Sequence, residues 1–187
     1  MSNTLVNNLP NEGDRQPAES LLIEILADDP LPAPWSEAEW DVKLRTAIEH
    51  ALAHRKYRCG EIGVRITEDS VIREINRRHL DHDYETDVIS FGYLADPPQI
   101  AGELVVSIET ARRSAAEAGW PLANELLLYV VHGTLHITGM EDQDPCSRAE
   151  MRIAERDVLR QLGIEDAEKY APAEPRSSEI HAPGGSQ

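Results

Sequence analysis

Cysteine is scarce in this sequence of 187 residues, which contains two. Cys59 and Cys146 form no C-x-x-C pair and no disulfide framework, so we expect reduced thiols and a cytoplasmic location. No apolar run approaches the ~18 residues that a membrane-spanning helix needs. The N-terminus also lacks the basic segment and apolar stretch of a secretory signal. The sequence therefore favours a cytoplasmic protein without a membrane partner.

Positive charge is also in short supply. The chain has 18 Lys and Arg against 34 Asp and Glu, a net charge of −16, which argues against a protein held on nucleic acid by its overall charge. Residues 43–78 are an exception, with nine basic and five acidic side chains. This region could meet a polyanion locally, or its charges could be the ordinary solvated faces of helices.

Length and composition fit one globular domain. With 41% hydrophobic and 28% charged residues, the chain is long and apolar enough to bury a core. We expect this single domain at residues 21–168. The polar segment 1–20 and the Pro-, Gly- and Ser-rich segment 171–187 are expected to be disordered tails.

Hydrophobic periodicity predicts an α+β fold. Runs of apolar residues, or apolar residues at every second position, predict strands at 21–26, 60–66, 86–91 and 102–108. Apolar residues three or four positions apart predict helices at 37–54, 67–78, 109–118, 121–138 and 147–162. Thr67 is the expected N-cap of the second helix, and a Pro-rich turn is expected at 95–99. This order predicts a small mixed four-stranded sheet packed with about five helices, the apolar fourth helix lying between the sheet and other helices.

The end of that fourth helix carries the clearest candidate site. His132 and His136 lie four residues apart, on the same helix face. Gly139 is a natural helix stop, because glycine adopts the left-handed conformation at little cost, and the returning chain can bring Asp142 to the same point. Two imidazoles and a carboxylate suit a divalent metal such as Zn²⁺, with a position left for water. The alternative is a pair of core histidines, although burying two imidazoles without partners would be costly.

At these histidines the sequence resembles the YbeY family of bacterial metal-dependent endoribonucleases, also called rRNA maturation factors. His132-Gly133-Thr134-Leu135-His136 and Gly139 match the family's His-Gly-x-Leu-His-x-x-Gly position for position. Thr86–Phe91 resembles the family's Thr-Asp-Val-Leu-Ser-Phe strand, and Ile75-Asn76 resembles the Leu-Asn before it. Residues 102–107 resemble the strand that follows, so the likeness covers roughly residues 21–165.

The resemblance implies a metal-dependent single-strand endoribonuclease. It would act in rRNA maturation, at the 3′ end of the small-subunit rRNA, and in ribosome quality control. The implied catalyst is a water molecule on a Zn²⁺ ion held by His132, His136 and Asp142. Arg77 and Arg78 are the candidate RNA contacts. The implied partner is RNA, as rRNA or within a ribosomal subunit.

The sequence departs from the family pattern at the third ligand. The family usually has histidine there, and the aligned residue is Asp142. A carboxylate can still bind Zn²⁺, although its negative charge should make a bound water less acidic. Glu141 and Asp144 are neighbouring carboxylates that could take its place.

A second departure concerns positive charge. The family has an arginine after its Leu-Asn pair, and the aligned residue is Leu80. Arg77 or Arg78 could supply the missing charge, which is why both are candidate RNA contacts.

Two other functions fit part of the pattern. The spacing of His132, His136 and Asp142 is similar to that of a metzincin-like metalloprotease, but such enzymes need a glutamate directly after the first histidine, where this chain has Gly133. The other alternative is a non-catalytic ribosome-assembly factor with a structural metal, which the acidic charge and the changed third ligand leave open.

Overall fold

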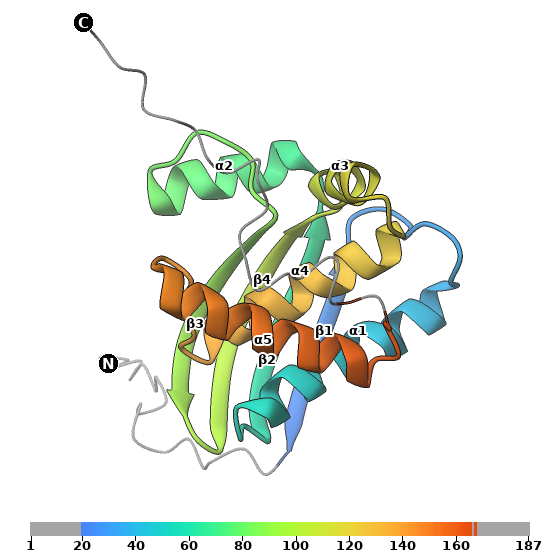
Figure 1. Cartoon of the computed structure of the whole chain (residues 1–187). Coiled ribbons are helices and arrows are strands. Elements are labelled where there is room, and N and C mark those ends of the chain that lie inside the picture. The colour runs from blue at the N-terminus through green and yellow to red at the C-terminus, as the bar shows by residue number, and fades with distance from the viewer. Residues whose placement is uncertain (1–19, 166, 168–187) are drawn as a thin grey trace, which may run out of the picture.

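The computed structural model describes residues 20–165 and 167, and the predicted tails at 1–20 and 171–187 lie outside this range except for Ser20. The described part contains four strands and five helices (Figure 1). In chain order these are β1 (Leu21–Ala27), α1 (Glu37–His54), β2 (Cys59–Thr67), α2 (Asp69–Leu80), β3 (Val88–Asp96), β4 (Gln99–Ser107), α3 (Ile108–Ala118), α4 (Leu122–Ile137) and α5 (Pro145–Gln161).

The four strands form one mixed sheet in the order β1-β2-β4-β3. The pairs β1–β2 and β2–β4 are parallel, and β3 runs antiparallel to β4 with a bulge between Gly92 and Leu94. Helix α1 connects β1 to β2, and α2 together with β3 connects β2 to β4, because a parallel pair cannot be joined by a tight turn. The predicted α+β fold with a mixed four-stranded sheet and five helices is confirmed.

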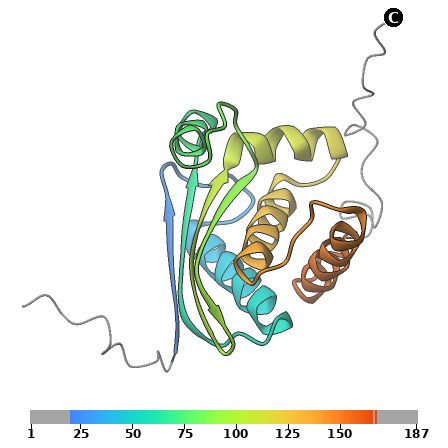
Figure 2. The same cartoon turned by 90° about the vertical axis from the view of Figure 1, so that its left-hand side faces the viewer.

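The helices are distributed unequally over the two faces of the sheet. Figure 2 shows α1 and α4 against one face and α5 on the far side of α4 from the sheet. On the other face, α2 packs through Ile72 and Ile75 against Ile89, Phe91 and Val105. Since α4 contacts β3, β4, α1, α3 and α5, it lies between the sheet and other helices, as its apolar sequence predicts.

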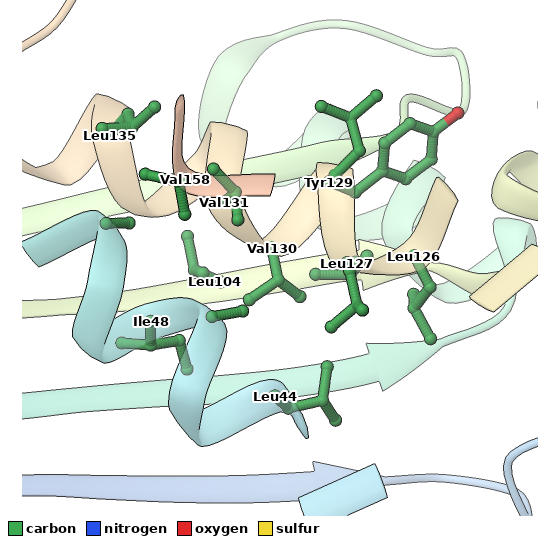
Figure 3. Close-up of a cluster of buried hydrophobic side chains, with 14 of the residues drawn as sticks. Leu44, Ile48, Leu104, Leu126, Leu127, Tyr129, Val130, Val131, Leu135 and Val158 are labelled. Atoms are coloured by element: carbon green, nitrogen blue, oxygen red, sulfur yellow. The ribbon is translucent and has the colours of Figure 1, made fainter. Parts of the chain in front are cut away.

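The core lies between the sheet and the helices around α4 (Figure 3). Leu104 of β4 is fully buried beneath this layer, and Val158 of α5 closes it from the outside. The same cluster contains the buried side chains Leu44, Ile48, Leu126, Leu127, Val130, Val131 and Leu135. Burial of each such side chain contributes about 1.5–3 kcal/mol to the stability of the fold. Since several of these side chains belong to α4, their burial holds this helix firmly in place.

Two glycines let the C-terminal half of α4 approach the sheet closely. A Cβ at Gly133 would lie 2.8 Å from side-chain carbons of both Leu104 and Val88. A Cβ at Gly102 of β4 would lie 2.7 Å from a side-chain carbon of Ile137. Contacts that short would force neighbouring atoms to shift, so hydrogen at both positions is what allows this half of α4 to rest so closely against the strands.

Several predicted boundaries were wrong by a few residues, and one cap was misassigned. Helix α2 begins after Glu68, not after Thr67. The Thr67 hydroxyl instead donates to Asp28 at 2.5 Å, a tertiary contact that the local sequence does not reveal. The strands β3 and β4 extend to Asp96 and from Gln99, so the turn between them is shorter than predicted.

Among the described residues, no helix combines the length and the apolar character that crossing a membrane requires.

We predict that Gly133→Ala lowers the free energy of unfolding by about 1–3 kcal/mol, the usual effect of overpacking. The direction of the change is informative, because replacing glycine by alanine at an uncrowded helical position would raise the free energy of unfolding. Gly63→Ala is the matched control, since its Cβ would meet only the flexible, exposed side chain of Glu103, at 3.2 Å. Urea denaturation of both variants measures the effect, and an unchanged or increased stability of Gly133→Ala would contradict the packing argument.

Candidate metal site

The two histidines of α4 face one another across one helical turn. Their rings are 4.4 Å apart between centroids and nearly perpendicular, and their Nε2 atoms are 3.0 Å apart. Both side chains are partly buried and both line an open cleft. They are therefore not residues of the apolar core, which was the alternative interpretation.

The partners of the other ring nitrogens determine which atoms carry protons. Nδ1 of His136 lies 2.8 Å from the Met140 carbonyl oxygen, and Nδ1 of His132 lies 2.6 Å from a carboxylate oxygen of Glu155. A carbonyl and an ionised carboxylate can only accept, so both Nδ1 atoms donate. In the neutral rings both Nε2 atoms then present lone pairs toward the same point, which is an arrangement that a cation would stabilise.

Asp142 brings a carboxylate to the same point. Its Oδ2 lies 3.8 Å from Nε2 of His132, and its Oδ1 lies 3.9 Å from Nε2 of His136. The chain reaches this position because Gly139 adopts the left-handed conformation at φ 85° after the helix ends. Arg148 of α5 then holds the loop by donating from Nε to the Asp142 carbonyl oxygen at 3.0 Å.

The neighbouring carboxylates have other surroundings. Asp144 is the N-cap of α5, where Oδ1 accepts from the backbone N–H of Cys146 and of Ser147. The hydrogen bonds from Ser147 hold the pKa of Asp144 below its ordinary value. Glu141 lines the cleft but, among the described residues, the carboxylate that joins the two histidines is that of Asp142.

The donor atoms of His132, His136 and Asp142 lie within 4.8 Å of one another, so this group could hold a metal ion. Ligands bound to a tetrahedral Zn²⁺ at ~2.0–2.1 Å lie roughly 3.3 Å apart. The nearest separations are 3.0 Å between the two Nε2 atoms and 3.8 and 3.9 Å from these atoms to the two different oxygens of Asp142, which are close to that value. The donor set of two nitrogens and one oxygen also leaves a position open for a substrate or water.

A fourth residue, Glu155, supports the site from α5 and was missed by the sequence analysis. Its side chain is fully buried, and it accepts from Arg152 at 2.9 Å as well as from His132. The signal was present, because Glu155 is four residues after Met151 and three before Val158 on the inward stripe of that helix. A charged residue on such a stripe indicates a buried polar partner.

His132 and Glu155 each stabilise the charged form of the other. Burial alone would lower the pKa of His132, but the hydrogen bond and the charge of Glu155 outweigh it and raise that pKa. Burial alone would raise the pKa of Glu155, and the hydrogen bond and charge of His132 together with Arg152 lower it instead. Burial and the neighbouring His132 lower the pKa of His136, which favours its neutral, ligating form.

The donor set opens into a cleft of about 510 Å³ between α4, β3 and the α2–β3 loop. Three carboxylates line it, those of Asp87, Glu141 and Asp142. Within the part of the chain that the structure describes, no lysine or arginine lines this cleft. Carboxylates therefore outnumber Lys and Arg side chains in the described lining of the cleft.

Arg77 and Arg78, the candidate RNA contacts, lie outside the lining of this cleft. Both are exposed on α2, and both pair with Glu74, at 2.8 and 2.5 Å. Asn76, the residue before them, does line the cleft. The two arginines thus follow a residue of the cleft along the chain, but the carboxylate of Glu74 partly neutralises their charges on the surface of α2.

Asp87 and Ser90 make hydrogen bonds to backbone groups. Asp87 Oδ1 accepts from the backbone N–H of Val88 at 2.8 Å. The Ser90 hydroxyl donates to the carbonyl oxygen of Gly133 at 3.1 Å, which ties β3 to the helix that carries the histidines.

Comparison with known proteins gives consistent results. The family model described as Endoribonuclease YbeY matches residues 32–163. A protein of that name from Rhodopirellula baltica is 46% identical over 164 residues, which cover 80% of this chain and 81% of the relative. A Chloroherpeton thalassium protein of the same name is 42% identical over 120 residues, covering 64% of this chain and 84% of the relative.

A solved structure shares the fold. The solution structure of a Thermotoga maritima protein superimposes with a TM-score of 0.56 at 22% sequence identity, covering 84% of this chain and 99% of that one. The donor set of this chain, the matched family model and the extent of these similarities agree with the resemblance of the histidine motif. The chain belongs to the YbeY endoribonuclease family.

Proposed function

We propose that the protein is a metal-dependent endoribonuclease that hydrolyses phosphodiester bonds of single-stranded RNA. The observation that carries this proposal is the convergence of His132, His136 and Asp142 at an open cleft. Family membership supports the same activity, because the relatives are named as endoribonucleases. An enzyme of this kind needs a cation held beside a groove that a nucleotide strand can enter, and the donor set and the adjoining cleft support both requirements.

The finer assignment is rRNA maturation in the cytoplasm. We propose that the substrate is the 3′ end of the small-subunit rRNA and that the protein also serves ribosome quality control. Zn²⁺ is the proposed ion, since two imidazole nitrogens and one carboxylate oxygen suit it. Arg77 and Arg78 remain candidate contacts for RNA outside the cleft.

The protein's own groups prepare the site before any substrate arrives. Glu155 fixes the ring of His132 and the Met140 carbonyl fixes that of His136, so both Nε2 lone pairs already point at the position of the ion. A divalent cation bound there would polarise a phosphoryl oxygen and lower the pKa of a water molecule. The three carboxylates of the cleft disfavour an RNA backbone in the absence of the ion.

Gly133 argues against the protease alternative. A proteolytic site of this spacing would need a glutamate at that position as general base. A side chain there would meet Leu104 and Val88 at 2.8 Å from its Cβ and force them to shift, so this packing disfavours a residue as large as glutamate.

The identity of the third ligand can be tested by replacing Asp142 or Asp144, one at a time, by asparagine. We predict that Asp142→Asn lowers Zn²⁺ affinity by about 10-fold or more and abolishes chelator-sensitive RNA cleavage, because it removes the charged donor. Asp144→Asn should leave both unchanged, because asparagine is also a good N-cap. Competition with a chromophoric chelator and cleavage of a labelled single-stranded RNA measure the two effects. If Asp144→Asn lowered Zn²⁺ affinity and cleavage while Asp142→Asn did not, Asp144 would be the ligand.

We predict that Glu155→Gln lowers Zn²⁺ affinity by about 10–100-fold, the usual effect of removing a carboxylate that orients a ligating histidine. Glu150→Gln is the control, since Glu150 is exposed on the same helix. Isothermal titration on the folded, metal-free proteins measures the affinity directly. Equal affinities for the two variants would show that Glu155 serves the fold alone.

The same preparations separate catalysis from a structural metal. If Zn²⁺ raises the melting temperature but RNA remains intact with and without chelator, the protein is a non-catalytic assembly factor and the proposal fails. A His136→Ala variant that stays folded and metal-free yet still supports rRNA maturation would also overturn it. A peptide library exposed under the same conditions should remain uncut.

A further inference from the structure

Two stacked aromatic rings line the cleft beside the donor set. His82 and Tyr84, both in the loop between α2 and β3, have ring centroids 5.2 Å apart and planes inclined by 20°. The Tyr84 hydroxyl lies 3.2 Å from Nδ1 of His82. Tyr84 is nevertheless 54% exposed, and both residues line the same cleft as His132 and His136. Exposed aromatic surface is thus present within the site.

The loop that carries these rings is anchored at several points. The side chain of Asn76, which is 2% exposed, donates to the carbonyl oxygen of Tyr84 at 2.9 Å. Asp83, between the two aromatic residues, pairs with Arg73 of α2 at 2.8 Å. Because these contacts tie Asp83 and Tyr84 to α2, a ligand that stacks on the rings would have less of the loop to order.

The charges of the cleft leave an affinity problem that the rings can solve. A single-stranded RNA usually gains affinity from basic side chains along its backbone. The described lining of this cleft contains three carboxylates and no lysine or arginine. Apart from a bound cation, the described lining offers the RNA backbone neutral hydrogen-bonding side chains such as Asn76 and Ser90, so contacts with the bases would add affinity that side-chain charge does not supply.

We infer that His82 and Tyr84 form a nucleobase-binding subsite, in which an unpaired base of the RNA stacks on the aromatic pair while the neighbouring phosphate lies at the metal donors. This inference rests on the proposed function and adds the part of the substrate that the cleft recognises. Every base has a flat π-face, so such a platform tolerates different sequences. In a duplex those faces are covered by neighbouring base pairs, so the subsite selects single strands.

Binding of a short single-stranded RNA that carries 2-aminopurine tests the subsite, since stacking quenches its fluorescence. The measurement uses the full chain in the presence of chelator, where no cleavage occurs, and again with Zn²⁺. Tyr84→Ala should weaken binding by about 10-fold or more, the effect of losing one base–aromatic stack, and should reduce the quenching. Tyr84→Phe keeps the ring and should restore both.

The control is Tyr93→Ala, because Tyr93 is also an exposed tyrosine, on β3, but does not line this cleft. It should bind and quench like the unaltered protein. A second test replaces one nucleotide of the RNA by an abasic residue at each position in turn. When the abasic residue takes the place of the stacked base, the unaltered protein and Tyr84→Ala should bind the RNA with equal affinity. Thermal melting verifies that each variant is folded.

The outcomes distinguish this inference from the proposed function. If Tyr84→Ala binds and quenches like the unaltered protein, or if Tyr93→Ala weakens binding equally, the subsite is wrong even where metal-dependent cleavage is intact. If quenching depends on Tyr84 but no RNA is cut with Zn²⁺, the subsite stands as an RNA-binding site and the proposed activity fails.

Discussion

The close contact between α4 and the sheet is the constraint on which the site depends. Gly133 lies between the two histidines and against Leu104 and Val88, where no side chain would fit. A helix buried on nearly every side cannot rotate or slide without disturbing the core, because protein interiors are packed about as densely as crystals. The positions of His132 and His136 are therefore properties of the fold, whereas the third donor, Asp142, lies on the loop between α4 and α5.

The buried carboxylate of Glu155 joins the fold to the site in a second way. A charge in the interior is costly unless it is paired and hydrogen-bonded, and both of its oxygens have partners, one on α4 and one on α5. The same contact that orients His132 thus also fixes how α5 packs on α4. Since Arg148 of α5 holds the loop that carries Asp142, the position of α5 affects two of the three donors.

The sequence was most informative where the signal was local. The four-residue spacing of His132 and His136 and the helix stop at Gly139 depend on neighbouring residues, and the family motif lies on the same short stretch. Tertiary contacts were not predictable in this way. Thr67 has the propensity of a helix cap, yet Asp28, 39 residues away, takes its hydroxyl. Glu155 occupies an inward position on its helix, but nothing in the sequence says that its partner is His132.

The acidic cleft suggests how metal and RNA binding are coupled. With both imidazoles in their neutral, ligating form, the donor set carries the −1 charge of Asp142, and Asp87 and Glu141 add two carboxylates to the same cleft. A divalent cation changes the sign at the donors, so it should raise the affinity for a phosphate group placed there. By thermodynamic linkage, bound RNA must then raise the affinity for the cation by the same factor. In the family a histidine usually takes the place of Asp142, which leaves the donors one charge more positive. This chain should accordingly depend more on its cation, and on contacts that carry no charge, to hold its substrate.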